Sequence, residues 1–65
     1  MKIKYFPDTD VLLIDFSDHA IVDSQEINGY VLVNLDEDGF VVSMTIEHAK
    51  DRIDLNEFSY QTVAI

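Results

Sequence analysis

Three groups of side chains in this sequence have residue types that could do chemistry, and the first is Ser17-Asp18-His19. These are the residue types of a hydrolase triad, but adjacent residues of an extended chain point in different directions, whereas a triad is a spatial constellation. With Gly29 and Gly39 as the only glycines, the chain also lacks a glycine-rich phosphate loop. We therefore expect a turn at this tripeptide, no enzymatic activity and no catalytic residue.

The second group is Asn34-x-Asp36-x-Asp38-Gly39, which imitates the first half of an EF-hand calcium loop. Such a loop places oxygen ligands at alternate positions before a glycine and ends on an acid at its twelfth position. The twelfth position is Thr45, and the flanking segments have strand patterns instead of helix patterns. A hairpin turn rich in Asp and Gly explains the same residues, and calcium binding stays open as the less favoured alternative.

The third group consists of the two histidines, His19 and His48, which follow Asp18 and Glu47 in the sequence. Neither histidine has the HxxxH or clustered spacing that presents two metal ligands together. The chain contains no cysteine, which excludes disulfides and thiolate metal sites. We expect histidines in solvent-facing turns, no metal site and no cofactor.

The elements that position these residues are predicted to be mostly β-strands, because Val, Ile and aromatic residues are frequent while Ala and Leu are few. Alternating patterns predict strands over Met1–Phe6, Val11–Phe16, Ala20–Ile27, Tyr30–Leu35 and Phe40–Ile46. Turns are predicted at Pro7–Asp10, Ser17–His19, Asn28-Gly29 (of type I′) and Asp36–Gly39. Connections this short cannot join parallel strands, so we expect an antiparallel meander of about five strands.

The C-terminal part of the sequence has a different pattern. Between Glu47 and Phe58 the apolar residues Ala49, Ile53, Leu55 and Phe58 lie roughly on one helical face. This spacing predicts a short helix or a turn of 3₁₀ helix packed on the sheet. Strand character returns over Ser59–Ile65 and predicts a final strand. The expected fold is therefore α+β, predominantly β, in a single small domain of residues 1–65.

Both faces of the predicted sheet carry apolar side chains. The core positions on one face are expected to be Leu12, Ile14, Phe16, Val42, Met44 and Ile46, and the other face has Val11, Leu13, Leu32 and Phe40. A single short helix covers only one face, and an exposed apolar surface usually marks an interface. We therefore expect a homodimer, and Leu13 and Leu32 are candidate partner-facing residues.

Charge gives the strongest indication of function. Thirteen acidic residues against four Lys and Arg give a net charge of −9, and no Lys or Arg occurs between Tyr5 and Ala49. Such a surface repels nucleic acids and anionic membranes and attracts basic partners, so the turn acids Asp36, Glu37 and Asp38 are candidate partner-facing residues. Solubility alone explains the same charge, and both interpretations stay open. The sequence lacks the apolar runs of a signal peptide or membrane span, which favours a cytoplasmic protein.

Two segments resemble a known family of small prokaryotic proteins. Lys2–Ile14 (KIKYFPDTDVLLI) is similar to its entry pattern K-I-x-Y-D-x-x-x-D-x-L-Y-I. Val31–Glu47 (VLVNLDEDGFVVSMTIE) is similar to its centre V-x-x-D-x-D-x-x-G-x-x-V-G-I-E-I. The departures are Phe6 in the first segment, where Asp is common, and Asn34 and Ser43 in the second, where Asp and Gly are common. The family is domain of unknown function 2283, and the resemblance covers about residues 2–50.

The resemblance implies a small β-rich domain with no established catalytic residues. Members are often described as antitoxin-like partners of small basic toxins, and no binding residue can be carried over to this chain. The leading hypothesis is thus an acidic module that neutralises a small basic protein. The alternatives are a structural or regulatory homodimerisation domain and an acidic mimic of nucleic acid.

Overall fold

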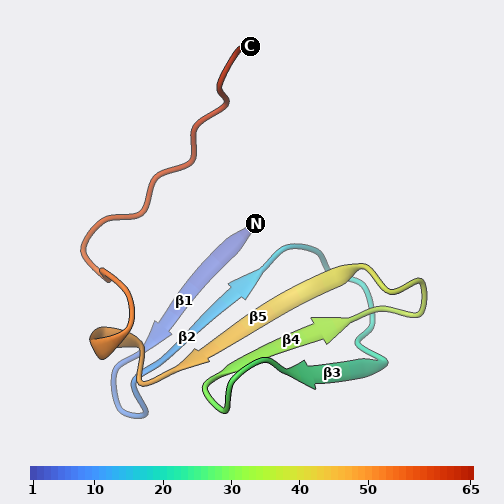
Figure 1. The fold of residues 1–65 in the computed structure, drawn as a ribbon, viewed down its shortest axis with the longest axis horizontal. Helices are drawn as coiled ribbons and strands as arrows, with labels where there is room; N and C mark the ends of the chain where they lie inside the picture. Colours follow the sequence, from blue (N-terminus) through green and yellow to red (C-terminus); the bar gives the residue numbers. More distant parts are fainter.

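The computed structural model describes residues 1–65 as five β-strands followed by one turn of 3₁₀ helix (Figure 1). The strands are β1 Lys2–Phe6, β2 Val11–Asp15, β3 Asp23–Glu26, β4 Val31–Leu35 and β5 Val41–Glu47, and the 3₁₀ turn, η1, is Ala49–Asp51. All neighbouring strands are antiparallel. The protein is therefore mostly β, and none of its helices has the length and apolar character to cross a membrane.

The strand order is β1-β2-β5-β4-β3, and this differs from the predicted meander. Strand β2 pairs with β5 and not with β3, because the connection between β2 and β3 comprises residues 16–22 and not the three-residue turn predicted from Ser17–His19. An extended segment of this length reaches about 23 Å, which is enough to pass β5 and β4, about 14 Å at normal strand spacing. Read from the C-terminal side, strands β5, β4, β3 and β2 form a Greek key.

The β3–β4 hairpin is present where Asn28-Gly29 predicted it, but its turn is not of type I′. That turn requires positive φ at both central residues, and only Gly29, at φ 82°, has it. The Ile27 N–H donates to the Val31 carbonyl at 2.8 Å, which leaves Asn28, Gly29 and Tyr30 in the loop. The loop therefore has three residues instead of two, and strand pairing begins one residue later than predicted.

The register defines two faces of the sheet, because directly paired residues share a face. One face has two apolar rows, Ile3–Ile14–Met44–Val33 and Tyr5–Leu12–Ile46–Val31, which we call the apolar face. The opposite face has the row Leu13–Thr45–Leu32 and the polar row Asp15–Ser43–Asn34–Ser24. A register shift at Asn34/Leu35, where Leu35 pairs with Val41, places Val42 as the extra residue of a bulge.

The C-terminal segment forms neither an α-helix nor a strand, so the predicted α+β fold with a final strand is wrong in this part. Within residues 47–58 only the shorter alternative, a 3₁₀ turn at Ala49–Asp51, is present. His48 precedes it at φ 54° and gives no side-chain cap, and so short a helix is unstable without packing. Residues 59–65 make no backbone pairing and run away from the sheet (Figure 1).

As a result, the sheet has no covering layer and the core is small. The buried apolar residues are Leu12, Val42 and Ala49. Of the other predicted core residues, Ile14, Met44 and Ile46 are half-buried, and Phe16 is 43% exposed. The burial predicted for that face requires a helix above it, and this chain does not supply one.

Candidate functional site

The β4–β5 turn is built around the carboxylate of Asp36. Its Oδ1 accepts hydrogen bonds from the backbone N–H groups of Asp38 and Phe40, both at 2.9 Å. The Gly39 N–H donates to the Asp36 carbonyl at 3.0 Å, and Gly39 has φ 84°, a conformation that glycine adopts without steric cost. The turn predicted at Asp36–Gly39 is thereby confirmed, and Asp36, although a candidate partner-facing residue, is buried inside it.

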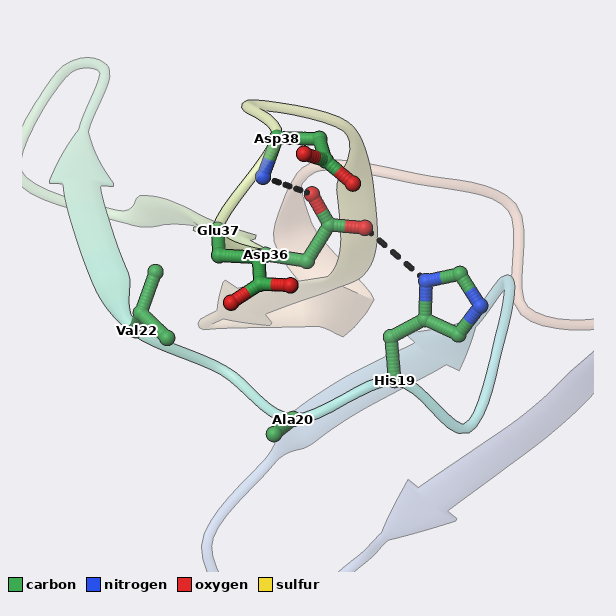
Figure 2. Close-up of a pocket in the computed structure, with 6 residues that line it drawn as sticks. All are labelled: His19, Ala20, Val22, Asp36, Glu37 and Asp38. Atoms are coloured by element: carbon green, nitrogen blue, oxygen red, sulfur yellow. Dashed lines mark hydrogen bonds and ion pairs between the residues drawn. The ribbon is translucent and has the colours of Figure 1, made fainter.

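The second oxygen of Asp36 binds His19. The His19 Nδ1–H donates to Asp36 Oδ2 at 2.9 Å (Figure 2), and because an ionised carboxylate only accepts, Nδ1 carries the proton. This hydrogen bond, reinforced by the negative charges of Asp36, Asp18 and Asp38, raises the pKa of His19. The same bond, followed by the two backbone donors, lowers the pKa of Asp36. The pair fixes the long β2–β3 connection to the β4–β5 turn.

A surface hollow of about 360 Å³ lies between the β2–β3 connection and this turn. Figure 2 shows His19, Ala20 and Val22 on one side of it and Asp36, Glu37 and Asp38 on the other. Glu37 and Asp38 are exposed, as is Asp18 in the connection. We call these two loops, with Asp18, His19, Asp36, Glu37 and Asp38, the acidic end of the sheet.

The Ser17-Asp18-His19 tripeptide does not form a catalytic triad. The His19 backbone N–H donates to Ser17 Oγ at 3.4 Å, while the His19 ring faces Asp36. No hydroxyl group hydrogen-bonds to the ring, so the histidine has an orienting carboxylate but no nucleophile to activate. The contact between His19 and Asp36 anchors the β2–β3 connection, and the carboxylates around it are exposed to solvent.

The oxygens of the EF-hand-like motif do not converge on one point. Asn34 Oδ1 accepts from Ser24 Oγ at 2.6 Å, and Asn34 Nδ2 donates to Ser43 Oγ at 2.8 Å on the opposite face of the sheet. The Asp36 oxygens bind backbone N–H groups and His19. Two of the would-be calcium ligands are thus already used within the protein, and no group of three His, Asp or Glu side chains lies close enough to share a metal.

The cations lie at both ends of the strands, and Lys2 lines a surface hollow together with Asp18 and His19. Lys2 and Lys4 are on edge strand β1, where Lys4 Nζ is 4.0 Å from Asp15 Oδ2. Lys50 and Arg52 lie in and after η1, beside the β1–β2 turn at the other end of the strands. The two loops of the acidic end contain no Lys or Arg, and Lys2 of the edge strand β1 is the cation beside them.

Asp10 and Tyr30 hold the segment around Lys50 and Arg52 in place. Asp10 Oδ1 accepts from Tyr5 Oη at 2.7 Å and from the Lys50 N–H at 3.1 Å. The Tyr5 bond is the main cause that raises the pKa of Tyr5 and lowers that of Asp10. The Arg52 guanidinium stacks on the Tyr30 ring at 3.6 Å, which fixes its charge near the β3–β4 turn.

The apolar candidates Leu13 and Leu32 lie in one row of the opposite face, on either side of Thr45. Leu32 is 37% exposed and pairs with Glu26 of β3, and Leu13 is half-buried and pairs with Lys4 of β1. They are not adjacent to the turn acids, so the structure does not gather the five candidate residues into one patch. Their contact with a partner stays a prediction.

Sequence reasoning missed the pairing of His19 with Asp36. The two residues are seventeen positions apart in the sequence, and nothing in the local pattern joins them. The available signal is that the sequence around His19 is rich in acids and contains no Lys or Arg, which favours a carboxylate partner on charge alone.

The fold and this site define a small antiparallel β-protein with one acidic end. Residues 2–50 match a family model described as "Protein of unknown function (DUF2283)", so the chain belongs to that family and the resemblance is confirmed. The match spans β1 to β5 and ends within η1, which leaves residues 51–65 outside it. Neither a curated protein nor a solved structure matches the chain.

Proposed function

We propose that this chain is an acidic protein-binding module whose partner is a small basic protein, as an antitoxin is for a basic toxin. The observation that carries this proposal is the acidic end, where Asp18, Glu37 and Asp38 are exposed in two loops that contain no Lys or Arg. A concentrated negative field of this kind increases the rate at which a cationic partner is encountered.

The rigidity of the acidic end supports the same role. Asp36 fixes the turn through two backbone N–H groups, and His19 ties the neighbouring loop to it. Carboxylates on a preorganised turn lose less conformational entropy on binding than carboxylates on a mobile loop. In this arrangement Asp36 positions the turn, while Glu37 and Asp38 face the partner.

We further propose that the module acts by binding and not by catalysis. The His19–Asp36 pair has no hydroxyl or thiol to activate, and the chain has no cysteine. Three of the six residues that line the hollow beside the pair are acids, which suits lysine or arginine side chains of a partner. Leu32, exposed beside Glu26, offers a separate apolar contact away from that hollow.

The experiment is co-expression with short basic proteins encoded in the same genome, beginning with the immediate neighbour. The expected result is a partner that inhibits growth when expressed alone, is neutralised by this chain and co-purifies with it. Neutralisation should weaken in the double variant Glu37→Gln with Asp38→Asn. A nucleic-acid-binding enzyme captured in place of a small basic protein would contradict the proposal and favour the nucleic-acid mimic.

A further inference from the structure

Much more surface is exposed than a chain of this mass normally leaves in water. The exposed surface is 5176 Å², whereas a compact monomer of 7.5 kDa exposes about 4,250 Å². The radius of gyration is 12.9 Å, against about 10.7 Å for a compact chain of this length. The excess of about 900 Å² resembles what one partner buries in a stable protein–protein interface, about 800 Å².

Two parts of the chain contribute exposed apolar surface, in addition to loop residues such as Ile27 and Phe40. One is the apolar face, where Ile3 and Tyr5 are 44% and 37% exposed and the row Ile14–Met44–Val33 is only half-buried. The other is the segment Phe58–Ile65, which we call the arm. Within it Phe58, Tyr60 and Val63 are 48%, 83% and 71% exposed, and Figure 1 shows the arm leading away from the sheet.

We propose that two copies of this chain exchange arms, so that the arm of each copy lies across the apolar face of the other. A second copy supplies both missing pieces at once, a face for the arm and an arm for the face. A different partner placed on the apolar face would leave the arm uncovered.

Charge supports a second copy as the occupant. The chain carries a net charge of −9, so two copies repel each other wherever their acidic surfaces meet. The arm, FSYQTVAI, contains no charged residue, and the two rows of the apolar face contain none either. Contact through these two surfaces therefore brings together the uncharged parts of an acidic molecule.

The dimensions agree with this arrangement. An extended arm of this length spans about 26 Å, and the five strands of the sheet are about 19 Å across at normal spacing. One arm is thus long enough to cross the apolar rows, which lie on β1, β2, β5 and β4. The acidic end lies in the loops beyond the strands and remains open to a basic partner in the exchanged dimer.

The experiment combines mass measurement with intermolecular spin labelling. Light scattering at micromolar concentration should give twice the monomer mass of 7.5 kDa. Because the chain has no cysteine, Gln61→Cys provides a single site for a nitroxide on the arm. Mixing this spin-labelled copy with a methyl-labelled copy should broaden the methyl signals of Ile14 and Val33. The methyls of Leu13 and Leu32, next in the same strands but on the opposite face, serve as the matched control.

A variant test accompanies the labelling. Tyr60→Asp with Val63→Asp should weaken the dimer at least tenfold, and both side chains are so exposed in the single chain that its fold should not change. Thr9→Asp with Asn56→Asp adds the same charge at exposed positions outside the arm and should leave the dimer close to wild type.

Three results would overturn the proposal. A monomer at millimolar concentration would exclude the exchange. A further sample is a copy that carries both the nitroxide and the methyl label, diluted into unlabelled chain. Broadening in this sample, without broadening between separately labelled copies, would mean that the arm folds back on its own sheet. Broadening at Leu13 and Leu32 would place the interface on the opposite face. None of these results depends on the acidic end, so they leave the proposed function to its own test.

Discussion

At the scale of single residues, Asp36 and His19 connect the middle of the β2–β3 connection to the β4–β5 turn. Backbone hydrogen bonds from Phe16, Ser17 and Val22 hold the two ends of that connection. Asp36 uses one oxygen for its own turn and the other for the His19 ring. These two functions can be separated by substitution. Asn at position 36 keeps a carbonyl oxygen for the turn but removes the charge, whereas Ala removes both.

The first prediction concerns the pKa of His19 in Asp36→Asn. Since the hydrogen bond to Asp36 is the largest cause that raises the pKa of His19, losing the carboxylate should move this pKa toward the ordinary value of 6.5. An NMR titration of the His19 ring protons in both proteins measures the change. A His19 pKa that is the same in the variant and the wild type would show that the two side chains do not pair in solution.

The second prediction is the pH dependence of the stability that this pair provides. The raised pKa of His19 means that its contribution is complete below pH 6.5 and is lost as the pH rises through the folded-state value. The lowered pKa of Asp36 means that its contribution is present above pH 3.8 and is lost as the pH falls through the folded-state value. The pair therefore stabilises most between these limits.

Thermal unfolding of the wild type and His19→Gln across the pH range tests this prediction. The Tm difference should be largest near pH 5 and should shrink by pH 9. Because His19 is largely solvent-exposed, the difference should be no more than a few degrees and should decrease in high salt. A Tm difference that grows toward alkaline pH would have the wrong sign for this pairing.

At the scale of elements, the two loops of the acidic end have different origins. The β4–β5 turn is local, since Asp36 and Gly39 define it within one tight reversal. The β2–β3 connection is not local, because it has to cross β5 and β4 and ends only when Val22 N–H reaches the Leu35 carbonyl at 2.9 Å. The stability of the site therefore depends first on the turn.

The third prediction tests the turn through Gly39. A Cβ added there meets no atom within 4 Å, so the effect of a substitution comes from the backbone, which has φ 84°. Gly39→Ala should lower the free energy of unfolding by about 1 kcal/mol, the usual cost of a left-handed conformation. Gly39→Asn should cost less, because Asn tolerates this region. Denaturant titration measures both, and equal losses in the two variants would contradict the backbone explanation.

The sequence predicts the local elements well and the long-range ones poorly. The strands and the turns at Pro7–Asp10 and Asp36–Gly39 are found within a few residues of their predicted bounds, because alternation and turn chemistry act over short distances. The strand order was missed, since nothing local indicates that residues 20–22 stay unpaired and lengthen the connection. The C-terminal helix was wrong because Ala49, Ile53 and Leu55 have helical spacing, but the segment has neither a cap nor enough length.

The same distinction applies to the candidate site. Glu37 and Asp38 are exposed as their place in a polar turn predicts, whereas Asp36, of identical type and in the same turn, is buried. Sequence patterns do not distinguish these carboxylates, because the difference depends on which one faces the N–H groups of the turn and the ring of His19. Leu13 and Leu32 lie on a common face as predicted, and their role in binding awaits a test.

At the scale of the whole molecule, the chain presents two surfaces of different chemistry. The acidic end carries exposed carboxylates, while the apolar face and the arm carry no charge. Long-range attraction of a partner depends on the first, and burial of apolar area depends on the second. The two proposals can be tested separately for this reason.

The fourth prediction concerns the location of the charges that attract a basic partner. Glu37→Gln with Asp38→Asn removes two charges at the acidic end, and Asp8→Asn with Asp51→Asn removes two exposed charges at the other end of the strands. Both double variants change the net charge from −9 to −7, since each removes two negative charges. Any difference in association rate between the two double variants therefore results from the location of the removed charges, because their number is the same.

The association rate of the co-purified basic partner, measured by stopped flow over a range of salt concentrations, tests the central claim most directly. The acidic-end variant should associate several-fold more slowly at low salt and show a weaker salt dependence, because electrostatic steering acts on the association rate. The control variant should remain close to wild type. Equal rates and equal salt dependence in the two variants would contradict the claim that the acidic end binds the partner.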